Sequence, residues 1–266
     1  MIHWLIQQAD LRDGDAVQRL SYAVEELGMT AHVVPYVPFG GMDYSFLPKD
    51  EPVFAYGSVS MIRDAQARCE RAPVAYCDWS QLRCSTYYAH YGAHLLQSPY
   101  ALLPLAEVRR LRTQLFLDLG EDHALFIRPD ENDKSFDGQV VYATDFEHFY
   151  ELAQRSGESP EVLCVVARPT RILQEWRVLI GAGEVVTGSQ YRRRGSLELI
   201  GEVPDEVASY ARLLASLWSP HPLFVMDIAR TSEGLRLIEI GSVNCAGLYA
   251  CDLRAFANAV KSVLSG

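Results

Sequence analysis

The segment that most constrains the fold is PLFVMDIARTSEGLRLIEIGSVNCAGLY, residues 222–249. Two apolar stretches, 223–229 and 235–240, lie on either side of the turn-forming sequence TSEG. Apolar, β-rich runs separated by such a turn predict a β-hairpin. Gly234 suits the left-handed last position of a three-residue hairpin loop, so we expect residues 232–234 to form that loop.

The predicted loop sets the register of the two strands. Thr231 then pairs with Leu235, and counting outward places Asp227 directly opposite Glu239. Side chains alternate along a strand, so two paired residues point to the same face. Like charges directly opposite destabilise a sheet, and a buried carboxylate without a partner is costly. A cation bound between Asp227 and Glu239 resolves this conflict.

Asn244, just beyond the second strand, adds an amide oxygen to the two carboxylates. This set of oxygens suits Mg²⁺, which keeps several waters and is shared with substrate phosphates. The alternative is that both acids lie on a solvated face. That alternative is weakened by the apolar neighbours of the two acids: Val225, Met226, Leu237 and Ile238.

Length and composition are those of a globular protein with one large domain or two small ones. The 266 residues are 49% hydrophobic and 22% charged, and the formal net charge of −10 argues against general nucleic-acid binding. No apolar run reaches the roughly 20 residues of a membrane span, and the N-terminal segment, which turns acidic, does not resemble a signal peptide. The six cysteines form no CxxC pair, so we expect reduced thiols in a cytoplasmic protein.

The first 97 residues predict a small α/β layer. We expect helices from Asp13 or Asp15 to Leu27 and from Val59 to about Glu70, and strands at 2–6, 31–34, 53–56 and 74–76. This β-α-β-β-α-β order indicates a sheet with a parallel core.

The rest of the chain predicts an α+β region, because strand pairs alternate with single helices. The expected helices are 104–119, 145–153, 206–217 and 253–264. Besides the hairpin at 222–249, the expected strands are 124–129, 139–144, 162–167, 174–180 and 185–191.

Several charged residues lie in or beside these strands. Arg128 falls inside an apolar strand, and Lys134 lies in a polar loop that ends in glycine. Glu175 and Arg177 flank Trp176, so both point to the face opposite the tryptophan. A cluster of three arginines begins at residue 192. Taken singly, each has an ordinary structural explanation, as an ion pair or a solvated charge. A basic set and a Mg²⁺-type acidic set in one region are what a nucleoside triphosphate needs.

The common phosphate-binding motifs do not occur in this sequence. It contains no GxxxxGK[ST] loop and no GxGxxG after a strand, which excludes a P-loop NTPase and an ordinary dinucleotide-binding protein. It also contains no GxSxG nucleophile elbow.

Three short motifs in the right order resemble the ATP-grasp family: FIRP…DKSFDG, EWRVLIGAGEVVTGSQYR and MDIA…LIEIGSVNCAGLYACD. The chain is most similar to the clade in which an arginine replaces the first nucleotide-binding lysine. The resemblance covers residues 98–266 and implies an ATP-grasp domain there. The region 1–97 is then similar to the small α/β domain that precedes ATP-grasp domains.

The resemblance implies a role for each residue of the nucleotide site. Arg128 contacts the α-phosphate and the adenine side, and Lys134 comes from a mobile loop that closes over the phosphates. Val165 and Val166 form the hinge whose backbone reads the adenine edge. Glu175 holds the ribose hydroxyls.

The resemblance also implies the reacting end of the site. Arg177 reaches the γ-phosphate or the acyl phosphate, and Asp227 and Glu239 bind Mg²⁺. Most family members place the metal-binding asparagine two residues after the glutamate, where this chain has Gly241. Asn244 is the expected substitute.

The function implied by the resemblance is an ATP- and Mg²⁺-dependent ligase. It activates a carboxylate as an acyl phosphate for attack by an amine or a thiol. Arg192 is expected to dock the carboxylate, and the expected substrates are small molecules or peptides. Four tyrosines either line the acceptor pocket or pack in the core: Tyr87, Tyr88, Tyr191 and Tyr249. The alternatives are an ATP-binding regulatory or peptide-tagging partner without ligase turnover, and a phosphotransferase.

Overall fold

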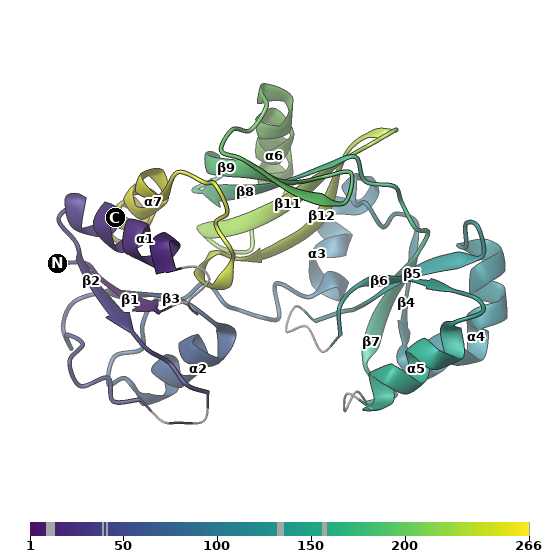
Figure 1. Cartoon of the computed structure of the whole chain (residues 1–266), viewed down its shortest axis with the longest axis horizontal. Helices are drawn as coiled ribbons and strands as arrows, with labels where there is room; N and C mark the ends of the chain where they lie inside the picture. The colour runs from purple at the N-terminus through teal and green to yellow at the C-terminus, as the bar shows by residue number, and fades with distance from the viewer. Residues whose placement is uncertain (9–13, 39, 41, 132–135, 156–158, 266) are drawn as a thin grey trace.

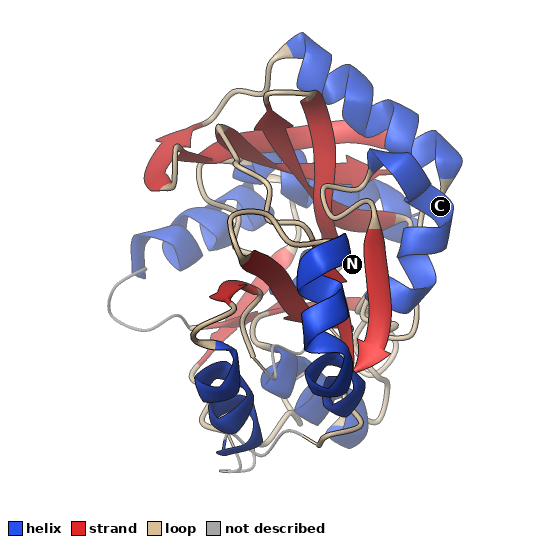
Figure 2. Cartoon of the chain, turned by 90° about the vertical axis from the view of Figure 1, so that its right-hand side faces the viewer, coloured by secondary structure: helices blue, strands red, loops and turns tan. Residues whose placement is uncertain are grey.

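Three β-sheets are arranged along the molecule. The computed structural model describes residues 1–8, 14–38, 40, 42–131, 136–155 and 159–265. A three-stranded sheet lies at one end, a five-stranded sheet in the middle and a four-stranded sheet at the other end (Figure 1). In the view turned by 90°, helices cover the outside and strands the interior (Figure 2).

The N-terminal sheet is parallel, as the sequence predicts. Its strand order is β2-β1-β3, formed by β1 (His3–Gln7), β2 (Thr30–Val34) and β3 (Val53–Tyr56). Helix α1 (Gly14–Glu26) connects the first two strands and α2 (Val59–Arg68) follows the third. The strand expected at 74–76 is reduced to a single bridge between Phe54 and Val74.

The C-terminal helix completes the core of the N-terminal sheet. Helix α7 (Leu253–Ser265) lies beside α1, and the fully buried Phe256 contacts Trp4, with ring centroids 5.3 Å apart, and Phe54. The two ends of the chain therefore share one hydrophobic core. Packing does not follow a single division of the chain near residue 98.

The four-stranded sheet is antiparallel, in the order β4-β7-β5-β6. Helices α4 (Leu105–Asp118) and α5 (Phe146–Arg155) pack against it in a separate core. Its strands are β4 (Tyr100–Pro104), β5 (Ala124–Pro129), β6 (Gln139–Tyr142) and β7 (Leu163–Ala167). The sequence predicts all of these except β4.

The five-stranded sheet is antiparallel, in the order β10-β9-β8-β11-β12. Helices α3 (Cys84–Tyr91) and α6 (Asp205–Leu217) pack on one face, and part of the other face packs against α7. Its strands are β8 (Gln174–Gly181), β9 (Glu184–Arg193), β10 (Ser196–Ile200), β11 (Leu223–Thr231) and β12 (Gly234–Ser242). Two short 3-10 helices, η1 (Gly92–His94) and η2 (Val243–Cys245), complete the fold.

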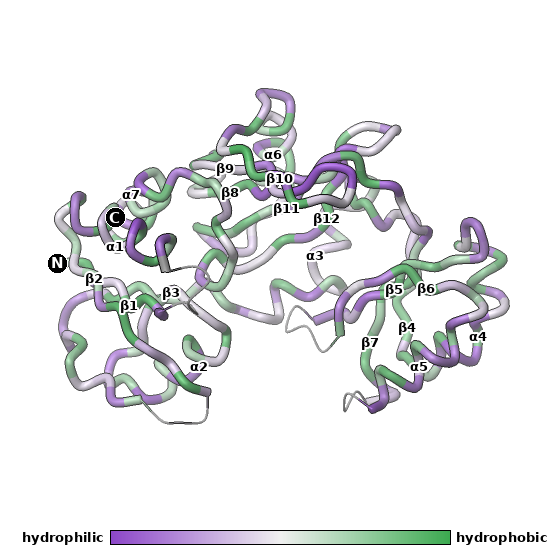
Figure 3. The backbone as a smooth tube through the Cα atoms, viewed as in Figure 1, coloured by the Kyte–Doolittle hydropathy of each residue, from purple (hydrophilic) through white to green (hydrophobic). Residues whose placement is uncertain are grey.

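Hydrophobic residues follow the strands of all three sheets (Figure 3). In the described part of the chain, no helix is long and apolar enough to cross a membrane.

The hairpin at 222–249 forms, but its loop is one residue shorter than predicted. Thr231 pairs with Gly234 rather than with Leu235, so the loop has two residues. A β-bulge then inserts Ile238 as an extra residue on β12, and Asp227 still pairs with Glu239. The predicted facing of the two acids is therefore confirmed, although the register that predicted it is wrong over the first four pairs.

Phe256→Ala tests the shared core of the two chain ends. We expect a loss of about 3–5 kcal/mol in the free energy of unfolding, because a fully buried aromatic ring leaves a cavity. Urea unfolding followed by circular dichroism measures this loss. Phe46→Ala is the matched control, because Phe46 is 45% exposed and its loss should cost less than about 1 kcal/mol. Equal effects of the two changes would contradict the shared core.

Candidate active site

The residues expected to bind ATP gather at one cavity between the five-stranded and four-stranded sheets. The cavity has a volume of about 540 Å³. Strand β5 contributes Arg128, and the five-stranded sheet contributes the remaining predicted residues: Glu175, Arg192, Asp227 and Glu239. Segments far apart in the sequence therefore meet at one site.

Two β-bulges aim side chains into this cavity. One inserts Tyr191 between two regular pairs of β8 and β9, and the other inserts Ile238 on β12. A bulge breaks the alternation of side chains, so two consecutive residues oppose one partner. Tyr191 and Arg192 both line the cavity, and so do Ile238 and Glu239.

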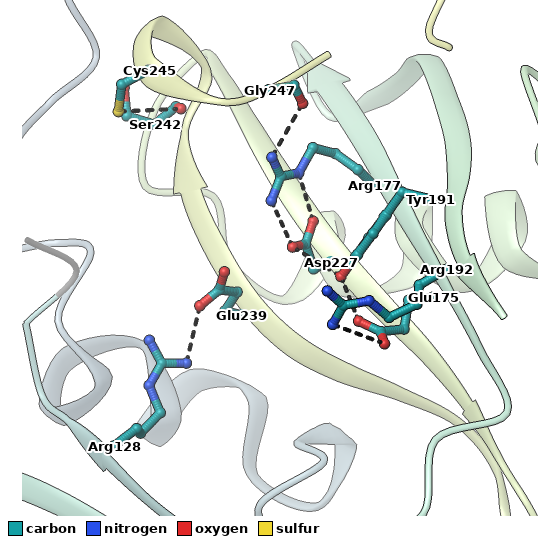
Figure 4. A network of polar contacts seen from close by, with 10 residues as sticks. All are labelled: Arg128, Glu175, Arg177, Tyr191, Arg192, Asp227, Glu239, Ser242, Cys245 and Gly247. Carbon is teal, nitrogen blue, oxygen red and sulfur yellow. Dashed lines mark hydrogen bonds and ion pairs between the residues drawn. The ribbon is translucent and has the colours of Figure 1, made fainter. Parts of the chain in front are cut away.

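Arg177 forms a bidentate ion pair with Asp227. Its Nε donates to Oδ1 at 2.8 Å and its Nη2 to Oδ2 at 2.7 Å, while Nη1 donates to the carbonyl oxygen of Gly247 at 3.1 Å (Figure 4). Both side chains are largely buried. Burial by itself lowers the pKa of Arg177, but the charge of Asp227 outweighs burial and raises that pKa above its ordinary value. Arg177 is therefore a permanent buried cation.

Arg128 forms the second ion pair, with Glu239. The distance from Arg128 Nη1 to Glu239 Oε2 is 3.1 Å (Figure 4). The Arg128 side chain is only 9% exposed, whereas that of Glu239 is 32% exposed. Desolvation lowers the pKa of Arg128, and the surrounding groups, Glu239 among them, more than restore it. This pair links the four-stranded sheet to the five-stranded sheet.

Tyr191 connects the two acids of the central strands. Its hydroxyl donates to Glu175 Oε2 at 2.7 Å and lies 3.4 Å from Asp227 Oδ2. Burial and the two nearby carboxylates raise the pKa of Tyr191 well above its ordinary value, so the hydroxyl stays protonated and can donate. Arg192 Nη1 lies 3.8 Å from Glu175 Oε1 and remains half exposed.

A family model describes this region. The model for an ATP-grasp domain, clade family 3, matches residues 58–260. The chain belongs to the ATP-grasp family. As a member of this family it is an ATP-dependent ligase of the ATP-grasp type. The match begins before the boundary at residue 98, at Ser58, which caps α2. A comparison with curated proteins found no match.

Solved structures share the fold over almost the whole chain. D-cycloserine synthetase DcsG has a TM-score of 0.67 and 17% identity, covering 99% of this chain and 100% of its own. A RimK domain ATP-grasp protein from Sphaerobacter thermophilus has a TM-score of 0.64 and 13% identity, covering 100% of both chains. Macrocyclase MdnC from Microcystis aeruginosa, bound with precursor peptide MdnA, has a TM-score of 0.60 and 12% identity, covering 100% of both chains. At these identities the likeness establishes the ATP-grasp fold.

Asp227 and Glu239 are suited to a metal shared with a ligand. They are paired across β11 and β12 and both line the cavity. In the described ranges, no group of three or more His, Cys, Asp or Glu side chains is placed to hold a metal by itself. Two carboxylates fit Mg²⁺, which takes its remaining ligands from water and phosphates.

Asn244 does not have the geometry expected of a metal ligand. Its side chain is fully buried in η2, where Oδ1 accepts from the amide of Tyr76 at 2.8 Å and Nδ2 donates to the carbonyl of Ala55 at 2.6 Å. Both ends of the amide are therefore used to join η2 to the N-terminal sheet. The sequence prediction failed because it counted residues along the chain and did not foresee that the chain turns away after β12.

Val165 and Val166 do not have the backbone geometry expected of a hinge. Strand β7 lies between β4 and β5, and both valines pair with residues on each side. Their N–H and C=O groups are used within the sheet and are not available to adenine. The connection between the two sheets begins only after Ala167, at residues 168–173.

The other predicted residues divide into three groups. Lys134 lies outside the described residues. Tyr87 and Tyr88 are buried core residues beneath the five-stranded sheet. Tyr191 and Tyr249 lie at the site, with rings stacked 4.8 Å apart. The sequence analysis missed several lining residues, including Ile238, Ile172 and Gln97. Ile238 had no local signal because only the bulge turns it inward.

Asn244→Ala distinguishes a structural role from a metal role. We expect a loss of about 1–3 kcal/mol in the free energy of unfolding, because the change leaves buried backbone groups without partners. The Mg²⁺ concentration that gives half-maximal ATP turnover should stay the same. Asn258→Ala, an exposed change on α7, is the control and should alter neither quantity. A higher Mg²⁺ requirement with unchanged stability would restore Asn244 to the metal site.

Proposed function

We propose that the protein uses ATP and Mg²⁺ to convert a substrate carboxylate into an acyl phosphate, which an amine or a thiol then attacks. The observation that carries the proposal is the pair of buried arginines, Arg128 and Arg177, each bound to a carboxylate of the facing pair Asp227 and Glu239. The site holds opposite charges ready for an ion that is itself composed of phosphates and a metal.

The balance of charges favours a nucleotide that enters with cations. Among the described residues that line the cavity, five carboxylates face two guanidinium groups. A bare triphosphate would be repelled by this surplus of negative charge. Bound Mg²⁺ would neutralise the phosphates and polarise the transferring group. Asp227 and Glu239 would hold it, and the arginines that they now bind would be free to contact phosphate oxygens.

Individual roles follow from position. Arg128 binds the α-phosphate side, where the four-stranded sheet meets the cavity, and Arg177 binds the γ-phosphate and later the acyl phosphate. Glu175, oriented by Tyr191, accepts from the ribose hydroxyls. We assign the backbone contact with adenine to residues 168–173, because they leave the four-stranded sheet. Arg192 is exposed at the rim and docks the substrate carboxylate.

The reaction has two steps. A carboxylate oxygen attacks the γ-phosphorus while the bond to the ADP oxygen breaks. The nucleophile then attacks the acyl carbon, the carbon–oxygen bond to phosphate breaks, and the nucleophile loses a proton. In both steps the described residues position groups and stabilise negative charge, which is the main demand of phosphoryl transfer.

The substrates are carboxylates and amines of small molecules or peptides. D-cycloserine synthetase and the macrocyclase bound with a precursor peptide exemplify both classes among proteins of this fold. The two alternatives are an ATP-binding partner without turnover and a phosphotransferase. A panel of amino acids and peptides with radiolabelled ATP separates the three. A ligase forms ADP and a heavier conjugate, a phosphotransferase forms a stable phosphorylated product, and a binding protein forms neither.

Asp227→Asn and Glu239→Gln test the metal assignment. We expect each change to reduce Mg²⁺-dependent ATP turnover at least about 100-fold, because a carboxylate ligand of the metal becomes neutral. Glu184→Gln is the control, because Glu184 is an exposed acid on β9 of the same sheet. Circular dichroism verifies the fold of each variant. Turnover that survives both changes would remove Asp227 and Glu239 from the metal site.

Lys134→Ala tests the proposed loop lysine. We expect the dissociation constant for ATP to rise about tenfold, as the loss of one phosphate contact worth about 1.4 kcal/mol would produce. Calorimetric titration with a non-hydrolysed ATP analogue and Mg²⁺ measures it. Lys49→Ala, at an exposed site paired with Glu70, should leave the constant unchanged. Unchanged affinity in Lys134→Ala would make this lysine an ordinary surface charge.

A further inference from the structure

A second large cavity lies beside the reaction site, with a volume of about 590 Å³. It is bounded by α1, the end of β3, the edge strand β10 and the segment that leads into α7. Its lining is largely apolar and includes Val17, Leu20, Leu197, Leu199, Leu248 and Leu253. None of these residues has a role in the nucleotide site.

The apolar cavity adjoins the reaction site through two shared residues. Gly247 and Tyr249 line it and also line a smaller cavity of about 250 Å³ that contains Arg177, Asp227 and Glu239. Gly247 is also the residue whose carbonyl oxygen accepts from Arg177 (Figure 4). A ligand in the apolar cavity is therefore separated from the phosphate-binding arginine by the width of one residue.

Tyr249 forms the wall between the two cavities. Its φ of 49° is a left-handed conformation that a bulky residue rarely adopts. Its ring stacks on Tyr191, and the Arg177 guanidinium carbon lies 5.1 Å from the ring centroid. Strained residues of this kind concentrate at ligand-binding sites, where surrounding contacts hold them.

Edge strand β10 leaves apolar side chains uncovered at this cavity. Leu197 is 70% exposed and Leu199 is 49% exposed. The two residues are separated by one position, so they lie on the same face of the strand. A ligand in the cavity would cover them.

The charge of the lining indicates what such a ligand carries. Among the described residues that line the cavity, Arg19 is the only charged one, although the chain as a whole has a net charge of −10. Its Nε donates to the backbone oxygen of Asp15 at 3.4 Å, which leaves the guanidinium charge without a carboxylate among the described ion pairs. An apolar molecule with a carboxylate complements this surface, whereas an amine without a carboxylate does not.

We propose that this cavity binds an apolar carboxylic acid, such as an amino acid with a large hydrophobic side chain, as a co-substrate of the ligation. The inference rests on the proposed function and names the substrate class of that site. The apolar group occupies the space between α1 and β10, and the reacting group lies at Tyr249, next to Arg177.

Equilibrium binding to the full-length protein tests this proposal, measured by calorimetry with and without Mg²⁺ and ADP. We expect L-phenylalanine and L-leucine to bind at least tenfold more tightly than L-serine and L-glutamate. Phenethylamine, which has the same ring as phenylalanine but no carboxylate, should bind at least tenfold more weakly than phenylalanine. Equal binding of the polar amino acids, or no binding of phenylalanine and leucine under either condition, would overturn the proposal.

Two exposed leucines provide a matched pair of variants. Leu199→Asp should weaken phenylalanine binding at least tenfold, because it places a negative charge on the apolar wall. Leu213→Asp, at a position on α6 that is 47% exposed and away from the cavity, should leave binding unchanged. Arg19→Gln should weaken phenylalanine more than phenethylamine. Unchanged affinity in Leu199→Asp, with a native circular dichroism spectrum, would contradict the assignment.

Turnover measurements separate this inference from the proposed function. If ligation occurs with polar acids alone, the cavity assignment fails and the ligase function stands. If phenylalanine binds but ATP is not consumed with any nucleophile, the ligase function fails and the cavity assignment stands. With phenylalanine labelled by ¹⁸O in its carboxylate, label in the released phosphate identifies it as the activated acid. Label retained in the conjugate alone identifies it as the nucleophile.

Discussion

The bidentate ion pair between Arg177 and Asp227 is the interaction on which the site depends. Both partners come from central strands of the five-stranded sheet, and both are largely buried. Removing one member of such a pair leaves an uncompensated charge, so neither residue can be lost without its partner. Arg128 and Glu239 repeat the arrangement across the cavity and join the two sheets. The nucleotide site is thus held together by charges that a phosphate-bound metal can replace in kind.

The architecture of the sheet explains why so many polar groups converge. Strand alternation sends Trp176 into the core beneath α6 and its neighbours Glu175 and Arg177 to the opposite face. Two bulges then add Tyr191 and Ile238 to that face, beyond what alternation alone permits. Regular strands supply rigidity, and the bulges supply the additional directions that a binding site needs.

The ends of the chain form a second structural unit that supports the first. Helix α7 packs with α1, and Asn244 joins η2 to the N-terminal sheet through its buried amide. The segment between η2 and α7 carries Gly247 and Tyr249, which border both the reaction site and the apolar cavity. Because this segment is anchored at both ends, contacts in the N-terminal sheet determine where Tyr249 stands relative to Arg177.

The sequence by itself determined the strands around the site, the burial of Arg128 and the facing of Asp227 and Glu239, because apolar periodicity and turn residues are local signals. Only the tertiary structure decided the rest. The hairpin loop is shorter than Gly234 suggested, and a bulge at Ile238 compensates, since bulges depend on pairing with other strands. Val165 and Val166 proved to be paired on both sides, and Asn244 faces another sheet. Which backbone and amide groups remain free depends on contacts between distant segments, and these are settled only when the whole chain packs.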